Sequence, residues 1–242
     1  MRVWKQNYLL LILVFAAFVV GAVFLSRGVD TLPASAFGEG EWEGPCIVID
    51  AGHGGEDGGA VSCTGVNESQ INLEIALRLD DFLHLMGHRT LMLRTEDISL
   101  HSDGCTTISE KKVSDLKNRV RRVEEIPNAL LVSIHQNQFS QSKYHGAQVF
   151  FAPTDGSEAL AEQLQEALRV AVDPQNRRKC KKADSVYLMN KITCPGVLVE
   201  CGFLSNPTEE AKLRDPTYQK KLAAAIGCAV SRSLEGTEYH ES

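Results

Sequence analysis

Short apolar runs rich in valine, isoleucine and leucine alternate with longer segments of helical periodicity along most of the chain. The runs do not alternate between polar and apolar residues, which is typical of strands that are covered on both faces. This strand-then-helix order predicts an α/β fold with a single open, mostly parallel sheet and helices on both faces. The expected strands are residues 46–50, 89–94, 129–135, 146–151 and 196–201.

Amphipathic helices are expected between these strands. The first begins near Asn67, which forms a capping-box-like pair with Gln70. Its apolar stripe starts at Ile71 and continues at spacings of 4, 4 and 3, and Gly87 ends the helix. We expect three further helices at residues 112–125, 157–172 and 216–234.

An uncharged apolar segment of 18 residues, 8–25, follows Arg2 and Lys5 near the N-terminus. Its length suits either a short membrane span or a long secretory core. The positive charge before it predicts that the N-terminus stays inside and the rest of the chain lies outside. We therefore expect a membrane anchor or signal segment at residues 1–27, a linker at 28–45 and a tail at 236–242. The domain between them is expected to be extracytoplasmic, either membrane-anchored or secreted.

Charge and cysteine content narrow the classes of function. The chain has a net charge of −6 and no stripe of lysine and arginine, so a nucleic-acid partner is not expected. Its seven cysteines are odd in number and none has CxxC spacing. Neither a disulfide framework nor a cysteine-type zinc site is indicated, and we expect free thiols.

Residues suited to metal and proton chemistry lie where the expected strands end. His53 follows the first strand, His135 ends the third, and Glu200 lies near the end of the fifth. Glu68 opens the first helix, where the helix dipole stabilises a carboxylate. Because open α/β sheets hold their sites beyond the carboxyl ends of strands, we expect these four side chains to converge.

Two imidazoles and one carboxylate, with a fourth position open to solvent, are the usual ligands of a catalytic zinc ion. His53, Glu68 and His135 provide this set, and the metal would activate water for hydrolysis. Glu200 is the candidate acid/base and Asn137 a candidate donor to the oxyanion. Taken singly, a histidine after a strand is more often structural, and Glu68 is simply a first-turn acid. Spacing alone therefore leaves a zinc site and a structural role equally open.

Four segments in order resemble the signatures of the zinc-dependent N-acetylmuramoyl-L-alanine amidases, the amidase-3 family. They are VIDAGHGGEDGGA at 48–60, NES at 67–69, SIHQNQ at 133–138 and VLVECGFLSNPTE at 197–209. The resemblance implies a catalytic domain at residues 46–235 that cleaves the amide between muramic acid and L-alanine in peptidoglycan. It also implies one Zn2+ per chain, bound by His53, Glu68 and His135, with Glu200 as the catalytic acid/base.

Within that family the chain is most similar to the germination-specific amidases of spore formers. The resemblance is carried by residues 108–120 and by the absence of a recognisable wall-binding module. It implies a role in cortex maturation, where muramic-δ-lactam forms, and in germination, with an activating or targeting protein as a further partner. The basic residues of 108–120, Arg119 among them, are expected either to bind stem-peptide carboxylates or to form a solvated helix face.

Other functions remain as alternatives. A vegetative autolysin would use the same chemistry, whereas a metallo-carboxypeptidase or a peptidoglycan deacetylase would use a similar ligand set on a different bond. A non-catalytic peptidoglycan-binding module is the alternative from another class. The presence of His53, Glu68, His135 and Glu200 together argues against that module.

Overall fold

A computed structural model of the chain describes residues 44–238, with side chains described up to residue 235. The expected membrane segment at 1–27, most of the linker at 28–45 and most of the tail at 236–242 lie outside these residues. Among the helices of residues 44–238, none has the length and apolar character needed to cross a membrane.

The described residues contain one six-stranded sheet in the order β2-β1-β3-β6-β4-β5. Parallel pairing joins β1 to β2 and β3, β3 to β6, and β4 to β5, whereas β4 runs antiparallel to β6. The expected open and mostly parallel sheet is therefore confirmed. The strands are β1 (Cys46–Ala51), β2 (Thr90–Met92), β3 (Ala129–Asn137), β4 (Gln148–Phe151), β5 (Lys181–Lys182) and β6 (Gly196–Phe203).

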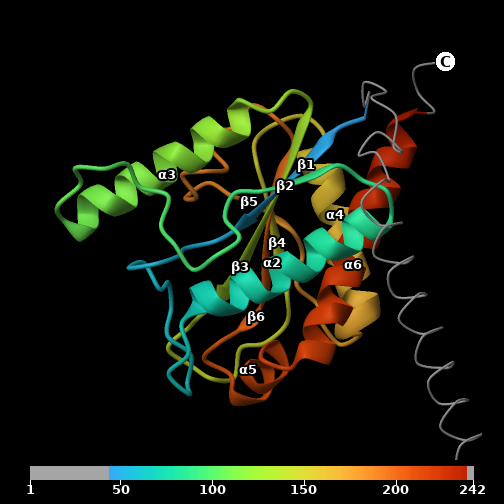
Figure 1. The fold of residues 1–242 in the computed structure, drawn as a ribbon. Helices are drawn as coiled ribbons and strands as arrows, with labels where there is room; N and C mark the ends of the chain where they lie inside the picture. Colours follow the sequence, from blue (N-terminus) through green and yellow to red (C-terminus); the bar gives the residue numbers. More distant parts are fainter. Residues whose placement is uncertain (1–43, 239–242) are drawn as a thin grey trace, which may run out of the picture. The chain divides into compact units, whose positions relative to one another are not determined.

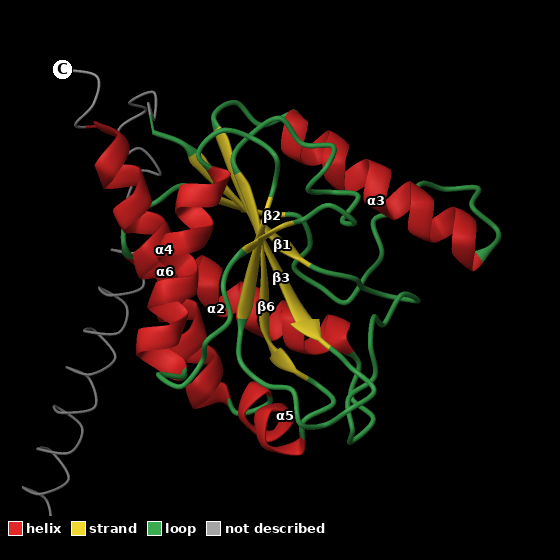
Figure 2. Ribbon diagram, turned by 180° about the vertical axis from the view of Figure 1, so that it is seen from behind, coloured by secondary structure: helices red, strands yellow, loops and turns green. Residues whose placement is uncertain are grey.

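Helices cover both faces of the sheet (Figure 1). One face packs against α2, α4 and α6, whereas α3 lies on the other face, as the view from behind also shows (Figure 2). Neighbouring residues of β1 divide between these faces: Ile47 and Ile49 join the core under α2, and Val48 joins the core under α3. Both faces are thus buried, which explains the continuous apolar runs. The helices are α2 (Glu68–Leu85), α3 (Ile108–Glu124), α4 (Ser157–Val172), α5 (Pro207–Leu213) and α6 (Pro216–Glu238).

Helix starts differ from the sequence expectation in two places. Asn67 occupies the N-cap position of α2, but its side chain makes no capping hydrogen bond, and Gln70 instead bonds to Glu74 in the next turn. In α3 the helix begins earlier than expected, because Thr107 and Glu110 form a complete capping box. The short elements β5 and α5 were not expected from the sequence.

All seven cysteines lie within the described residues and all are free thiols. Cys46 and Cys201 are buried, whereas Cys63 and Cys228 are exposed.

Candidate metal centre

His53 lies in the loop after β1 and has a backbone conformation that few residues other than glycine adopt. His53 has a φ of 60°, in the left-handed region that non-glycine residues rarely occupy. Two buried arginines hold this loop through its backbone carbonyl groups. Arg94 donates to the carbonyl oxygens of Ala51 at 2.8 Å and Gly52 at 3.0 Å, and Arg119 donates to that of His53 at 2.6 Å.

Two glycines make room for the ligand side chains. A Cβ atom on Gly52 would lie 2.2 Å from the imidazole ring of His135. A Cβ atom on Gly59 would lie 2.7 Å from Glu68 Oε2 and 2.8 Å from the ring of His53. Such contacts are far inside van der Waals distance, so the absence of side chains at these positions lets the three groups approach one another.

His53, Glu68 and His135 converge as the sequence predicted. Each offers one ligand atom, and these atoms all lie within 4.8 Å of one another. Glu68 Oε2 is 3.4 Å from His53 Nε2, and Glu68 Oε1 is 3.1 Å from His135 Nδ1. The three side chains come from the β1 loop, the first turn of α2 and the end of β3, so folding alone assembles the cluster.

Glu68 is buried at the start of α2 and is held as an anion. Its carboxylate accepts hydrogen bonds from the backbone N–H groups of Ala60 at 3.0 Å and Gln136 at 3.1 Å. Burial acts to raise the pKa of Glu68, but hydrogen bonds from His135 and His53 hold it well below its usual range. The Glu68 carboxylate can therefore bind a cation without first losing a proton.

His53 is oriented by a carboxylate that the sequence reasoning did not include. Asp57 Oδ2 lies 3.0 Å from His53 Nδ1, so the other ring nitrogen, Nε2, faces Glu68. Burial lowers the pKa of His53, but its hydrogen bonds to Asp57 and Glu68 raise it to about 9. A carboxylate behind a histidine is the usual support of a metal ligand. The acidic residue four positions after His53 is the sequence signal that marks this pair.

The donor set fits zinc. Two imidazoles and one carboxylate, with part of both rings exposed to solvent, match a catalytic zinc site with an open position. The side chains of His53 and His135 remain about one-fifth exposed, at 21% and 19%, while that of Glu68 is 5% exposed. Water and substrate therefore have access to the imidazole rings of His53 and His135.

Glu200 lies beside this cluster on β6, where its Cα pairs with that of His135 on β3. Its Oε2 atom is buried and makes no hydrogen bond within the described part of the chain. Burial raises the pKa of Glu200 to about 7, with Glu68 also raising it and the two histidines opposing. A buried carboxyl oxygen without a hydrogen bond is costly, and a pKa near neutrality suits an acid/base.

Asn137 and Arg119 occupy very different surroundings. Asn137 ends β3 after a bulge, with Phe203 as its Cα partner on β6, and its backbone oxygen accepts a hydrogen bond from Leu204. Arg119 is 2% exposed and turns toward the sheet, where it forms ion pairs with Asp50 and Asp115. Its guanidinium group is engaged inside the protein, which corrects the expectation that Arg119 contacts stem-peptide carboxylates. Arg119 supports the metal-site loop instead.

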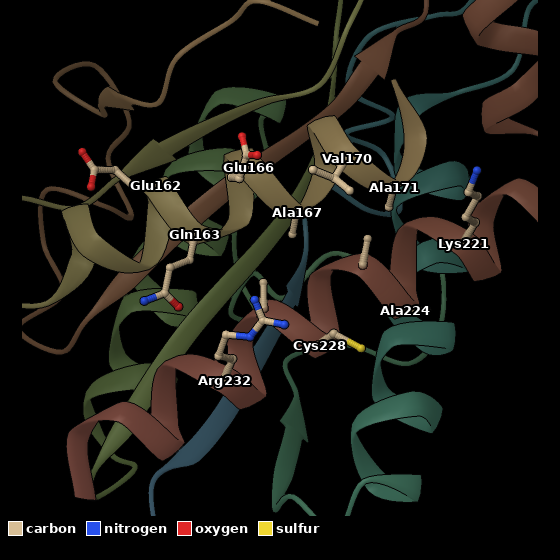
Figure 3. A pocket seen from close by; sticks show the side chains of 12 residues that line it. Glu162, Gln163, Glu166, Ala167, Val170, Ala171, Lys221, Ala224, Cys228 and Arg232 are labelled. Carbon is tan, nitrogen blue, oxygen red and sulfur yellow. The ribbon is translucent and has the colours of Figure 1, made fainter. Parts of the chain in front are cut away.

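A separate groove of about 810 Å³ lies between α4 and α6. Figure 3 shows small side chains of both helices along it, including Ala167, Ala171 and Ala224. Glu162 and Glu166 of α4 and Lys221 and Arg232 of α6 also line it. None of the lining residues belongs to the histidine–glutamate cluster, so the groove is distinct from the candidate metal centre.

Comparison with protein families gives a match over nearly all of the described domain. The family described as N-acetylmuramoyl-L-alanine amidase, Amidase_3, matches residues 47–232. The germination-specific N-acetylmuramoyl-L-alanine amidase of Bacillus subtilis is 39% identical over 184 residues, which are 76% of this chain and 77% of that protein. The amidase LytC of the same species is 31% identical over 186 residues, but the match covers only 34% of LytC.

Solved structures of amidases share the fold. The CwlD amidase of Clostridioides difficile, in complex with the GerS lipoprotein, matches with a TM-score of 0.76 and 39% identity over 79% of this chain and 99% of that one. An N-acetylmuramoyl-L-alanine amidase of Clostridium difficile 630 matches with a TM-score of 0.70 and 29% identity over 79% of this chain and 97% of that one.

Proposed function

From the premise that the chain belongs to the N-acetylmuramoyl-L-alanine amidase family, we propose that it is a zinc-dependent amidase of the spore cortex. The bond cleaved joins the lactyl carbonyl carbon of N-acetylmuramic acid to the nitrogen of L-alanine in peptidoglycan. The observation that carries the proposal is the convergence of His53, Glu68 and His135 beside Glu200, whose buried Oε2 atom makes no hydrogen bond in the described part of the chain.

Three side chains would hold one Zn2+ per chain: His53 through Nε2, Glu68 through its carboxylate and His135 through its ring. Zn2+ bound there supplies a Lewis acid that polarises the scissile carbonyl group and makes water nucleophilic near neutral pH. Asp57 fixes the orientation of the His53 ring through Nδ1. The buried Glu68 carboxylate offers the negative charge that attracts the cation.

Glu200 moves the proton in this proposal. Its carboxylate accepts a proton from the attacking water and delivers it to the nitrogen of L-alanine as the C–N bond breaks. The products are a free stem peptide and a muramic acid lactyl carboxylate. A pKa of about 7 allows both the acceptance and the donation near neutral pH. Asn137, at the end of β3, is the proposed hydrogen-bond donor to the developing oxyanion.

The test of the reaction uses the purified full-length chain and cortex peptidoglycan. Metal content is measured first, and products are then identified by mass with and without a chelator. We expect about one Zn2+ per chain and release of intact stem peptides that stops when the metal is removed. Release of acetate would indicate a deacetylase, and release of single C-terminal amino acids would indicate a carboxypeptidase. Binding without any product would support the non-catalytic module.

The cortex role rests on similarity to the germination-specific amidase of Bacillus subtilis. We expect this chain, expressed in a Bacillus subtilis strain that lacks that amidase, to restore muramic-δ-lactam in the spore cortex. A Glu200→Gln variant serves as the matched control and should not restore it. If cortex stays unmodified while vegetative wall is degraded, the chain is a vegetative autolysin of the same chemistry.

A lipoprotein partner and an extracytoplasmic location complete the proposal. The Clostridioides difficile CwlD amidase was solved in complex with the GerS lipoprotein. We expect a comparable protein to activate or target this amidase, with residues 1–27 attaching the chain to the membrane. Cell-wall amidase relatives act outside the cytoplasm, where peptidoglycan lies. Co-purification of the full chain from sporulating cells tests whether such a protein is bound.

A further inference from the structure

Three aromatic rings gather at the same end of the sheet as the candidate metal centre. Phe139 stacks on Phe203 with ring centroids 5.6 Å apart and an angle of 19° between the rings. Tyr144 lies 5.1 Å from Phe139 and 6.3 Å from Phe203. We call these three residues the aromatic platform. Within the platform Phe203 is fully buried, whereas Phe139 is 51% and Tyr144 37% exposed.

The platform adjoins the reacting groups through the two central strands. Phe203 ends β6 three residues after Glu200, and Phe139 follows β3 four residues after His135. At about 3.3 Å per residue along a strand, Phe203 lies roughly 10 Å from Glu200. A sugar unit that neighbours the reacting one in a glycan chain is therefore within reach of the platform.

Hydrogen bonds hold the loop that carries the exposed rings, residues 138–146. The N–H group of Phe139 donates to Ser205 Oγ at 3.2 Å, and the Tyr144 carbonyl group accepts from Asn206 Nδ2 at 3.2 Å. Glu209 joins the loop to β6, because its two carboxylate oxygens accept from the N–H groups of Gly146 and Phe203, each at 2.9 Å. Two large exposed rings on a loop fixed in this way form a preorganised surface.

The chemistry of the platform favours a sugar chain over an apolar partner. Aromatic faces carry partial negative charge, and they attract the partially positive C–H faces of pyranose rings. Cations flank the rings: the Arg178 guanidinium carbon lies 4.6 Å from the Phe203 ring centre, and Lys143 Nζ lies 5.4 Å from that of Tyr144. These charges suit a glycan that bears acidic stem peptides.

We propose that Phe139 and Tyr144 form a subsite for the glycan strand of peptidoglycan, next to the sugar whose amide bond is cleaved. This inference rests on the proposed amidase function and adds to it the part of the substrate that the enzyme recognises. The rings bind sugar units that neighbour the reacting muramic acid. Their contribution therefore appears with glycan chains and is absent with a single muramoyl peptide.

A binding experiment tests the subsite without depending on catalysis. The full-length Glu200→Gln protein is mixed with insoluble cortex peptidoglycan, and the bound fraction is measured by sedimentation. Phe139→Ala and Tyr144→Ala, each made in that protein, should weaken binding roughly tenfold. Tyr144→Phe keeps a ring and should bind like its parent.

Leu85→Ala is the matched control, because Leu85 is 85% exposed at the far end of α2. At about 1.5 Å per residue it lies roughly 25 Å along the helix from Glu68. Its binding should equal that of the parent. Thermal unfolding of each variant, monitored by circular dichroism, should show that it is folded at the temperature of the binding experiment, because Phe139 and Tyr144 are partly exposed.

A kinetic experiment in the active enzyme separates the subsite from the metal centre. Phe139→Ala should raise KM for glycan chains roughly tenfold, with kcat changed less than about twofold, and should leave KM for a monosaccharide muramoyl peptide unaltered. A lack of stem-peptide release by the unaltered chain, assayed together with the expected partner protein, would reject the amidase proposal itself. Equal binding of peptidoglycan by the parent, Phe139→Ala and Tyr144→Ala would overturn the subsite.

Discussion

Removal of the Arg119 side chain tests how the metal-site loop is held. Its guanidinium group forms ion pairs with Asp50 and Asp115 and donates to the carbonyl oxygens of Ala51, at 3.0 Å, and His53. Arg119 is 2% exposed and Asp50 1% exposed, so water cannot replace these contacts. Arg119→Met keeps much of the side-chain volume and removes the charge and all donors.

The expected cost follows from the buried charge that is left behind. Removing one partner of a buried ion pair lowers the free energy of unfolding by about 3–5 kcal/mol, because the other charge stays uncompensated. The Ser133 hydroxyl still donates to Asp50 at 2.6 Å, and Arg94 still donates to the Ala51 carbonyl oxygen, but the His53 carbonyl oxygen loses the donor that Arg119 supplies. For a domain of this size the loss corresponds to a fall in Tm of roughly 6–20 °C.

Urea unfolding followed by circular dichroism measures this cost, and zinc titration measures the effect on the loop. Arg119→Met should weaken zinc binding, since the His53 carbonyl group loses its anchor. The free energy of unfolding of Arg119→Lys should lie between those of the parent and Arg119→Met, because lysine keeps the charge but lacks the planar guanidinium group. Arg169→Met is the matched control: its pair with Glu166 on α4 is exposed, and its loss should leave the free energy of unfolding close to that of the parent.

A loss below about 1 kcal/mol for Arg119→Met would refute this reasoning. It would mean that Asp50 is neutral in the folded protein or that the loop rearranges to give it another donor. Zinc affinity unchanged from the parent would separately show that His53 does not depend on Arg119 for its position.

Three further predictions concern the same region. Glu200→Gln should lower kcat by about 100-fold or more while zinc stoichiometry stays at one, and a loss of metal would instead identify Glu200 as a ligand. Asp57→Asn should weaken zinc affinity by about 10- to 100-fold, measured by competition with a chelator, because the His53 ring loses its acceptor; unchanged affinity would reject the orienting role. Burial opposes ionisation of Asp50, but Arg119 and Ser133 hold its pKa below the ordinary value. Its stabilising contribution is therefore complete above pH of about 4 and is lost as pH falls through the lower folded pKa, so Asp50→Asn should flatten the acid side of the curve of unfolding free energy against pH. If the unfolding free energy of Asp50→Asn fell with acid as steeply as that of the parent, Asp50 would not be the source of this pH dependence.

The main strands and the position of the candidate metal centre could be predicted from local patterns. Continuous apolar runs indicated strands buried on both faces, and the structure has them in one mostly parallel sheet. His53 follows β1, His135 and Glu200 lie near the ends of β3 and β6, and the parallel pairing of these strands brings the three ends together. Because the carboxyl ends of parallel strands lie at the same edge of a sheet, residues far apart in the sequence form one cluster in space.

Charged residues were harder to interpret, as Arg119 illustrates. Arginine is mostly exposed in proteins, so a basic helix segment suggested solvent or substrate contacts. The packing of α3 against the sheet decided otherwise, because it buries Arg119 beside Asp50, which is 69 residues away in the chain. Neither residue by itself indicates this partner.

The sequence by itself determined the periodicity of each element, the sites where strands end and the chemical types of the candidate ligands. Only the tertiary structure decided which groups face one another: Asp57 behind His53, Glu68 toward both rings, and Phe139 on Phe203. The physical reason is the separation in the sequence between the residues that interact. Strand and helix patterns depend on neighbours a few residues apart, whereas burial and charge pairing depend on which distant segments the fold brings into contact.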